Sequence, residues 1–121
     1  MPLQGIEKFP KSARLRKRPE FLKLSRAGRA HQSANFVVIS KLNDRTGSRL
    51  GITVSRKVGN SVVRNRIKRL VREFFRRRRS TLAPACDFLI IARTSAAEMP
   101  GKSVGAELER ALIQQRHQRQ A

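Results

Sequence analysis

The stretch RLGITVSRKVGNSVVRNRIKRLVREFF, residues 49–75, changes its hydrophobic period partway along. Leu50, Ile52 and Val54 alternate with small or polar residues, the pattern of a strand with one buried face. Further on, apolar residues recur at every third or fourth position, the pattern of an amphipathic helix. Asn60 or Ser61 can cap that helix. The stretch predicts a strand followed by a helix whose apolar positions are Val63, Ile67, Leu70 and Phe74.

The predicted helix also carries an excess of cations beside its apolar face. Arg64, Lys68 and Arg72 form a row at i, i+4 and i+8, Arg66 lies on the far side, and Glu73 is the acid within the helix. Like charges at this spacing destabilise an isolated helix by a few tenths of a kcal/mol per pair. The pattern therefore favours a polyanionic partner over a merely solvated face. A second row beside the first consists of Asn65, Arg69 and Arg76.

Composition points to the same class of partner. A chain of 121 residues corresponds to one domain, 1–121, with a modest core. Its 28 Lys and Arg against 8 Asp and Glu give a net charge of +20, which a polyanion must neutralise. Nucleic acid is the first candidate, an anionic membrane surface the second and an acidic protein the third. The longest apolar run, 88–92, is too short to cross a bilayer. The single cysteine excludes an internal disulfide and fits a reducing compartment, so we expect a cytoplasmic protein without a membrane partner.

Two further elements are predicted ahead of the central stretch. Residues 18–28, RPEFLKLSRAG, suit a short helix, with Pro19 in its first turn and Gly28 at its end. Residues 35–42, NFVVISKL, are rich in strand-forming side chains, and the NDRTG that follows is typical of a turn. We therefore expect strands 35–42 and 49–55 to pair as a β-hairpin.

The rest of the chain adds a strand and a helix. Residues 87–92, DFLIIA, form a continuous apolar run, which predicts a strand covered on both faces. Ser103 can cap a final helix that ends near Gln115. The basic arm 1–17 is expected to be loosely ordered or to become ordered on binding, and the polar tail 116–121 is expected to fray. The order α-β-β-α-β-α predicts one α+β domain with helices on a small sheet. The inward positions of the last helix would be Val104, Leu108, Ala111 and Leu112.

The sequence offers no catalytic residue and no metal site of its own. Its eight acids are scattered, and Glu107 and Glu109, which are close in sequence, point to different helix faces. His31 and His117 lie at opposite ends, and one cysteine gives no zinc spacing. A protein nuclease needs clustered carboxylates or an acid–base pair. The pattern therefore predicts a nucleic-acid-binding protein that does not itself cut RNA.

The string SRKVGNSVVRNRIKRLVREFF closely resembles the signature of the bacterial ribonuclease P protein component, whose hallmark Arg-Asn-Arg is here residues 64–66. The resemblance extends from RLRKRPEFLKLSRAG to DFLIIAR, roughly residues 14–93. It implies a protein subunit of the ribonucleoprotein endoribonuclease that removes the 5′ leader from precursor tRNA. The catalytic RNA and precursor tRNA would be its partners, with no obligatory protein partner. Mg²⁺ would be held mainly by the RNA.

The resemblance also implies details of the fold. The family has a small mixed β-sheet of the type found in ribosomal protein S5 domain 2, with a possible extra short strand. Its strand–helix–strand unit, here residues 49–92, crosses over in the left-handed sense. General statistics favour a right-handed crossover instead. We follow the resemblance and expect the left-handed connection.

Site residues follow by position from the resemblance. Phe21, Phe36 and Thr53 would line a cleft between the sheet and the first helix that holds the single-stranded leader, where a base can stack on an aromatic ring. Core packing is the alternative role for both phenylalanines. Two cleft positions that are often aromatic in the family are here Ser25 and Ile39. The residues expected to contact the catalytic RNA are Arg56, Lys57, Arg64, Asn65, Arg66, Lys68, Arg69 and Arg72.

Two other functions stay open at this stage. A ribosomal protein would explain the charge and the α+β pattern, but not the Arg-Asn-Arg string. A stand-alone ribonuclease would cut RNA without an RNA partner.

Overall fold

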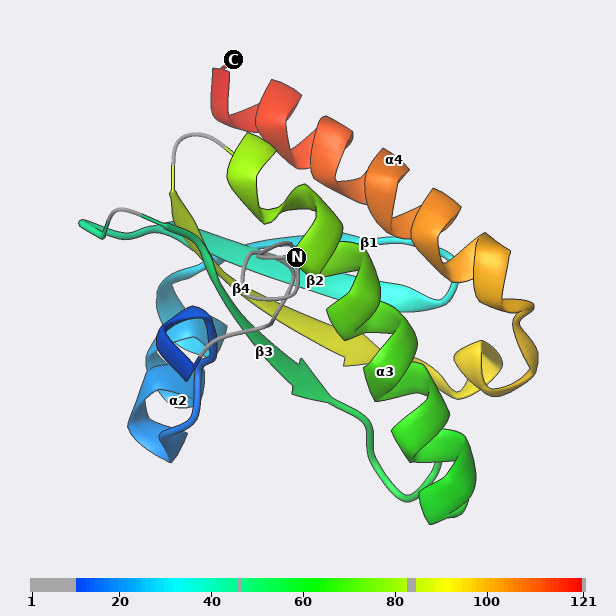
Figure 1. Ribbon diagram of the computed structural model, residues 1–121. Coiled ribbons are helices and arrows are strands. Elements are labelled where there is room, and N and C mark those ends of the chain that lie inside the picture. Colours follow the sequence, from blue (N-terminus) through cyan, green and yellow to red (C-terminus); the bar gives the residue numbers. More distant parts are fainter. Residues whose placement is uncertain (1–10, 46, 83–84, 121) are drawn as a thin grey trace, which may run out of the picture.

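The computed structural model describes residues 11–45, 47–82 and 85–120 of the chain. It has the expected α+β architecture, with a four-stranded sheet between helices (Figure 1). The elements in chain order are η1 (Lys11–Ala13), α2 (Arg18–Ala27), β1 (Arg29–Gln32), β2 (Phe36–Leu42), β3 (Arg49–Thr53), α3 (Ser61–Arg78), η2 (Arg79–Thr81), β4 (Cys86–Ala92), η3 (Thr94–Glu98) and α4 (Gly101–Gln120).

Strand β4 lies in the interior of the sheet, whose order is β1-β2-β4-β3. It pairs antiparallel with β2 and parallel with β3. The expected hairpin between residues 35–42 and 49–55 is therefore wrong. The apolar run of β4 explains the difference, because a strand with two apolar faces gains most from a central position. The hairpin is made instead by β2 and the short strand β1, which pair antiparallel.

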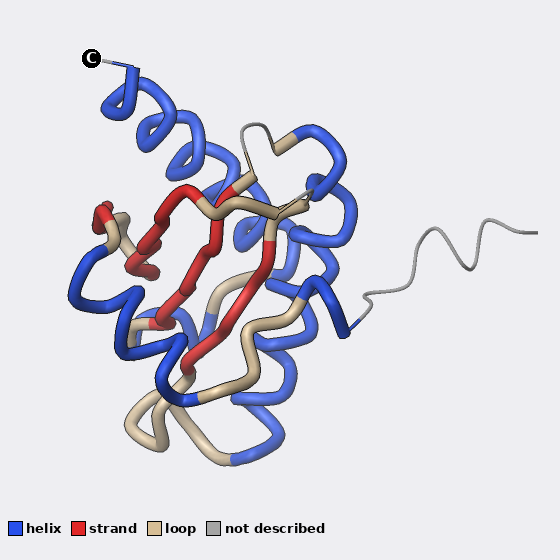
Figure 2. The backbone as a smooth tube through the Cα atoms, turned by 90° about the vertical axis from the view of Figure 1, so that its left-hand side faces the viewer, coloured by secondary structure: helices blue, strands red, loops and turns tan. Residues whose placement is uncertain are grey.

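The two faces of the sheet carry separate hydrophobic clusters. Helices α3 and α4 cover one face and α2 the other, and Figure 2 shows the strands between these two helical layers. Alternate residues of β4 divide between the faces: Phe88 and Ile90 pack under α3 and α4, and Leu89 packs under α2. Both faces of β4 are thus buried, as its sequence predicts.

Helix α3 begins at the predicted cap. The side chain of Asn60 accepts a hydrogen bond from the backbone N–H of Val63, at 3.0 Å. The buried arc is wider than expected, because α3 packs against both the sheet and α4. Val63 and Leu70 are only partly buried. The fully buried residues of the helix are Ile67, Val71, Phe74 and Phe75.

The β3–α3–β4 connection is left-handed. With α3 facing the viewer in Figure 1 and the parallel strands turned to point upward, the chain passes from β3 through α3 to β4 on the left of β3. The expectation taken from the family resemblance is confirmed, and the general preference for right-handed crossovers does not hold here.

The segment before α2 is packed rather than loose. Ala13 is 0% exposed and Leu15 5% exposed, and the backbone N–H of Leu15 donates to the carbonyl of Leu50 at 2.9 Å. The expectation of a loosely ordered arm is therefore wrong for residues 11–17. Residues 1–10 of that arm lie outside the described residues.

Buried polar side chains fasten α4 to the β1–β2 hairpin. Glu107 is 6% exposed and accepts hydrogen bonds from Ser33 Oγ and from the backbone and side-chain amides of Asn35, the latter two at 2.7 Å. Burial raises the pKa of Glu107, but these hydrogen bonds outweigh it and the pKa lies below its usual value. Gln115, 0% exposed, donates to the carbonyls of Arg29 at 3.0 Å and Val38 at 2.7 Å.

The limits of α4 differ from the predicted ones. The helix begins at Gly101, so Ser103 lies inside its first turn and is not the cap. Its last turns run through Gln120, beyond the predicted end near Gln115 and into the tail 116–121 that was expected to fray. Of the predicted inward residues, three are buried and Leu112 is partly buried.

Candidate nucleic-acid interface

Four cations of α3 lie outside the pocket between α3 and α4, whereas the exposed Arg77 and Arg78 line it. We call Arg64, Lys68, Arg69 and Arg72 the α3 cationic face. Arg69 and Arg72 are exposed, and Arg64 and Lys68 are half-buried. Asn65 is exposed on the same helix, and the loop ahead of it adds the exposed Arg56 and Lys57.

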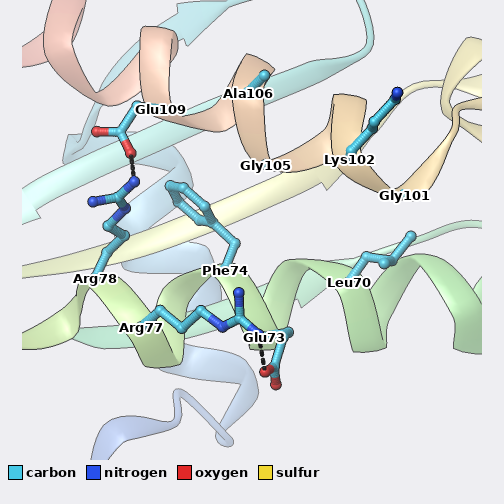
Figure 3. Close-up of a pocket in the computed structure, with 10 residues that line it drawn as sticks. All are labelled: Leu70, Glu73, Phe74, Arg77, Arg78, Gly101, Lys102, Gly105, Ala106 and Glu109. Atoms are coloured by element: carbon cyan, nitrogen blue, oxygen red, sulfur yellow. Dashed lines mark ion pairs between the residues drawn. The ribbon is translucent and has the colours of Figure 1, made fainter.

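Acidic partners divide the cations of α3 into two groups. Arg76 and Arg77 pair with Glu73, and Arg78 pairs with Glu109 of α4 at 2.6 Å. Figure 3 shows Arg78 reaching across to Glu109 of α4, while Arg77 pairs along its own helix with Glu73. Within the described part of the chain, no member of the α3 cationic face forms an ion pair. The described residues therefore supply acidic partners for Arg76, Arg77 and Arg78 but not for the α3 cationic face.

Two arginines of the Arg-Asn-Arg string make contacts within the protein. Arg66 is half-buried, and its Nη2 donates to the backbone carbonyl of Met99 at 2.7 Å, which joins α3 to the segment leading into α4. Arg64 Nε donates to the carbonyl of Gly59 at 3.2 Å, across the start of the helix. Arg66 thus lies apart from the α3 cationic face and has a structural contact of its own.

On the opposite face of the sheet, α2 covers one cross-strand row and leaves the next uncovered. The covered row contains Gly51, Leu89 and Ile39, all buried. A Cβ on Gly51 would lie 2.8 Å from Phe21 Cζ, so the absent side chain lets the Phe21 ring pack directly on β3. We call the uncovered row, which is half-buried or exposed, the outer row: Thr53, Ile91, Val37 and Gln32.

Of the three predicted cleft residues, two lie on this face. Phe21 is half-buried against the hydrophobic cluster beneath α2, which consists of Leu15, Leu24, Ile39 and Leu89. Thr53 is exposed in the outer row. Phe36 is 0% exposed and belongs to the cluster under α3 and α4. Its expected role as a stacking surface in the cleft is wrong, because strand alternation turns its ring to the other face of the sheet. Ser25 is exposed, and Ile39 is 7% exposed beneath α2.

Three charged residues join α2 to the sheet. Arg49 of β3 contacts Asp87 of β4 through Nε and Nη2, at 2.8 and 2.7 Å, and Glu20 of α2 through Nη1 at 2.9 Å. Burial raises the pKa of each carboxyl and is the largest cause. The hydrogen bond and charge of Arg49, together with hydrogen bonds from the Lys17 backbone to Glu20 and from Asn43 to Asp87, outweigh it, so both pKa values lie below their usual value. Sequence analysis missed this network, although Arg49 and Glu20 each stand at the edge of an apolar pattern.

A family model described as Ribonuclease P matches residues 9–116. The chain belongs to the ribonuclease P protein family. It is 47% identical over 104 residues to the ribonuclease P protein component of Desulforapulum autotrophicum, covering 86% of this chain and 89% of that protein. It is 44% identical to that of Geobacter sp. (strain M21), with the same coverage.

Solved structures of ribonuclease P proteins have the same fold. A Staphylococcus aureus RNase P protein mutant with defective mRNA degradation activity superposes with a TM-score of 0.81 at 35% identity, covering 88% of this chain and 90% of that one. The RNase P protein from Thermotoga maritima superposes with a TM-score of 0.75 at 36% identity, covering 82% and 94%. The chain is therefore a subunit of the ribonucleoprotein endoribonuclease ribonuclease P, with an RNA partner, and not a ribosomal protein.

The ribonuclease P subunit brings no metal-binding cluster together in its described residues, where no three His, Cys, Asp or Glu side chains lie close enough to hold an ion. The same part of the chain contains no helix that is both long and apolar enough to span a membrane. The described surface carries fixed positive charge and one accessible aromatic ring, that of Phe21. Both can bind RNA.

Proposed function

We propose that this subunit binds the catalytic RNA through the α3 cationic face and the 5′ leader of precursor tRNA across the outer row beside α2. By holding both, it assists endonucleolytic removal of the leader in the cytoplasm, while the catalytic centre lies in the RNA. The observation that carries the proposal is the division of charge on α3: Arg76, Arg77 and Arg78 are paired with Glu73 and Glu109, whereas the α3 cationic face has no acidic partner among the described residues.

The α3 cationic face suits a phosphate backbone. Arg64, Lys68 and Arg72 follow one another at successive turns of a helix, about 5–6 Å apart. Phosphates along an RNA strand can meet such a row one after another, and each contact releases condensed counterions. Arg56 and Lys57, in the loop ahead of α3, extend the row toward the end of β3.

The α2 side suits a single strand with unstacked bases. Phe21 presents a half-buried ring, and beside it the outer row offers partly exposed apolar side chains and the Thr53 hydroxyl. Base stacking on an aromatic ring contributes about 1–3 kcal/mol per base. Because Ser25 and Ile39 are not aromatic, the leader here depends on Phe21 for stacking and on nearby cations for backbone contacts.

A separate expectation concerns Mg²⁺. Fixed cations beside the RNA take the place of part of its counterion atmosphere. We therefore propose that Mg²⁺ is held mainly by the catalytic RNA, and that the protein lowers the Mg²⁺ concentration at which the RNA folds and cleaves.

The leader assignment is tested by comparing precursor and mature tRNA. In the reconstituted complex, Phe21→Ala should weaken binding of precursor tRNA by about 1–3 kcal/mol and leave mature tRNA unaffected. Ser25→Phe should strengthen precursor binding, because it adds a ring on the exposed side of α2. The matched control is Leu22→Ala, which removes an exposed apolar side chain from the same helix. If neither Phe21→Ala nor Ser25→Phe changes the ratio of the two affinities, the leader does not run past α2.

A further inference from the structure

Helix α2 lies between two cross-strand rows of the sheet. On one side is the outer row, and on the other lie Arg49 and Asp87, which are directly paired in the β3–β4 register. Glu20 reaches down from α2 to Arg49, while the next residue, Phe21, packs on Gly51 of the same strand. The first turns of α2 are thus joined to β3 by an ion pair and an adjacent aromatic contact.

We propose that Glu20 and Arg49 are positioning residues for leader binding. They hold the N-terminal half of α2 on β3, and they thereby fix the Phe21 ring beside Thr53 and Ile91. This inference rests on the proposed leader site, because the two residues are proposed to hold the Phe21 ring in place at that site. Neither residue contacts the leader in this scheme; both act through the placement of α2.

Burial and geometry support a defined position rather than a loose surface ion pair. The side chain of Arg49 is 12% exposed and that of Asp87 19%, whereas Glu20 is 30% exposed. Arg49 contacts Asp87 through two nitrogens, which sets the plane of its guanidinium and leaves Nη1 directed at Glu20. The sheet therefore presents a pre-oriented donor, and α2 must lie where Glu20 can accept from it.

Glu20 also caps its own helix. Its Oε1 accepts from the backbone N–H of Lys17 at 3.4 Å, while Oε2 accepts from Arg49. The two oxygens therefore fix both the first turn of α2 and its position on the sheet. A glutamine at this position has one acceptor oxygen, so it can satisfy the cap or Arg49 but not both. Glu20→Gln therefore weakens the connection to β3 and leaves the Arg49–Asp87 pair in place.

The network could instead contribute only to stability, and the experiment separates the two roles. Affinities of the reconstituted complex for precursor and mature tRNA are measured for wild type, Glu20→Gln and Glu98→Gln. Glu98 is an exposed acid in η3, so the second variant is a control for the loss of one negative charge. Amide hydrogen exchange across α2 is followed in the same three proteins.

For Glu20→Gln we expect the precursor-to-mature affinity ratio to fall by about tenfold, as when much of one stacked base is lost. Exchange across α2 should accelerate, and Glu98→Gln should match wild type in both measurements. Equal weakening of both tRNAs, or an unchanged ratio when Phe21→Ala lowers it, would overturn the positioning role. If Phe21→Ala itself leaves the ratio unchanged, the proposed leader site fails and this inference fails with it.

Discussion

Replacing Lys68 and Arg72 by alanine should weaken RNA binding without harming the fold. Lys68 and Arg72 lie on the α3 cationic face, and neither makes a hydrogen bond or ion pair to another described side chain. Arg64 is left in place because its Nε also donates to the Gly59 carbonyl. The double variant therefore removes two unneutralised charges and no hydrogen bond or ion pair to another described side chain.

The expected magnitude follows from counterion release. Each lost phosphate contact lowers the slope of log affinity against log salt by about 0.7–0.9, so two contacts lower it by about 1.4–1.8. Between 50 and 200 mM salt, wild-type affinity for the catalytic RNA should fall about tenfold more than that of the variant. Thermal stability should hold or rise, because repulsion worth a few tenths of a kcal/mol per i, i+4 pair is relieved.

The assay is binding of the catalytic RNA at four or more salt concentrations, with thermal unfolding of the free protein alongside. Arg77→Ala is the matched control, since Arg77 is an exposed arginine of the same helix that is paired with Glu73 on the α4 side. The control should leave the salt slope unchanged. If the double variant melts much earlier while its RNA affinity and slope equal those of wild type, the assignment of the α3 cationic face to RNA is refuted.

Three further predictions concern stability. Gly51→Ala should cost about 1–3 kcal/mol of unfolding free energy, because its Cβ would lie 2.8 Å from Phe21 Cζ; denaturant titration that detects no loss would contradict the close packing of that ring. Arg66→Ala should lower the free energy of unfolding by about 1 kcal/mol, because the Arg66 guanidinium donates a hydrogen bond to the Met99 carbonyl. It should leave the salt dependence of RNA affinity unchanged; a shallower salt dependence would instead show that Arg66 contacts a phosphate. Glu107 has a lowered pKa, so its stabilising contribution is present above about pH 4.3 and is lost as pH falls through its folded-state pKa. Acid unfolding should therefore be steeper for wild type than for Glu107→Gln, and equal pH dependence would show that the buried carboxyl is not held ionised.

Local periodicity predicted the main helices and strands but not the short strand β1, which only the family resemblance allowed for, and not all of the pairings. The strand of residues 49–55 and the helix after it were visible in the alternation of Leu50 and Ile52 and in the Asn60 cap. The β2–β3 hairpin was predicted from a turn-like sequence, and such a sequence carries no information on whether a third strand inserts between the two. The apolar run of β4 held the missing signal, since a strand with two apolar faces is favoured in the interior of a sheet.

The site was only partly predictable for a related reason. Charge spacing on a helix places Lys68 and Arg72 on one face without tertiary knowledge. Whether a cation is neutralised can depend on an acid in another element. Glu109 of α4, for example, neutralises Arg78 of α3. The side of the sheet that Phe36 faces depends on strand register, and its burial opposite α2 was not visible in the sequence. The polar residues on the inner face of α4, Glu107 and Gln115, did share the spacing of its apolar positions and could have been found by it.

The most direct test of the account is cleavage of precursor tRNA by protein alone, RNA alone and the two together, across a Mg²⁺ titration. We predict that protein alone cleaves nothing, that RNA alone cleaves only at raised Mg²⁺, and that the complex cleaves at low Mg²⁺. The Lys68→Ala, Arg72→Ala double variant should shift the Mg²⁺ requirement back toward that of RNA alone. Cleavage by the protein without RNA, or equal activity with and without protein at low Mg²⁺, would contradict the account.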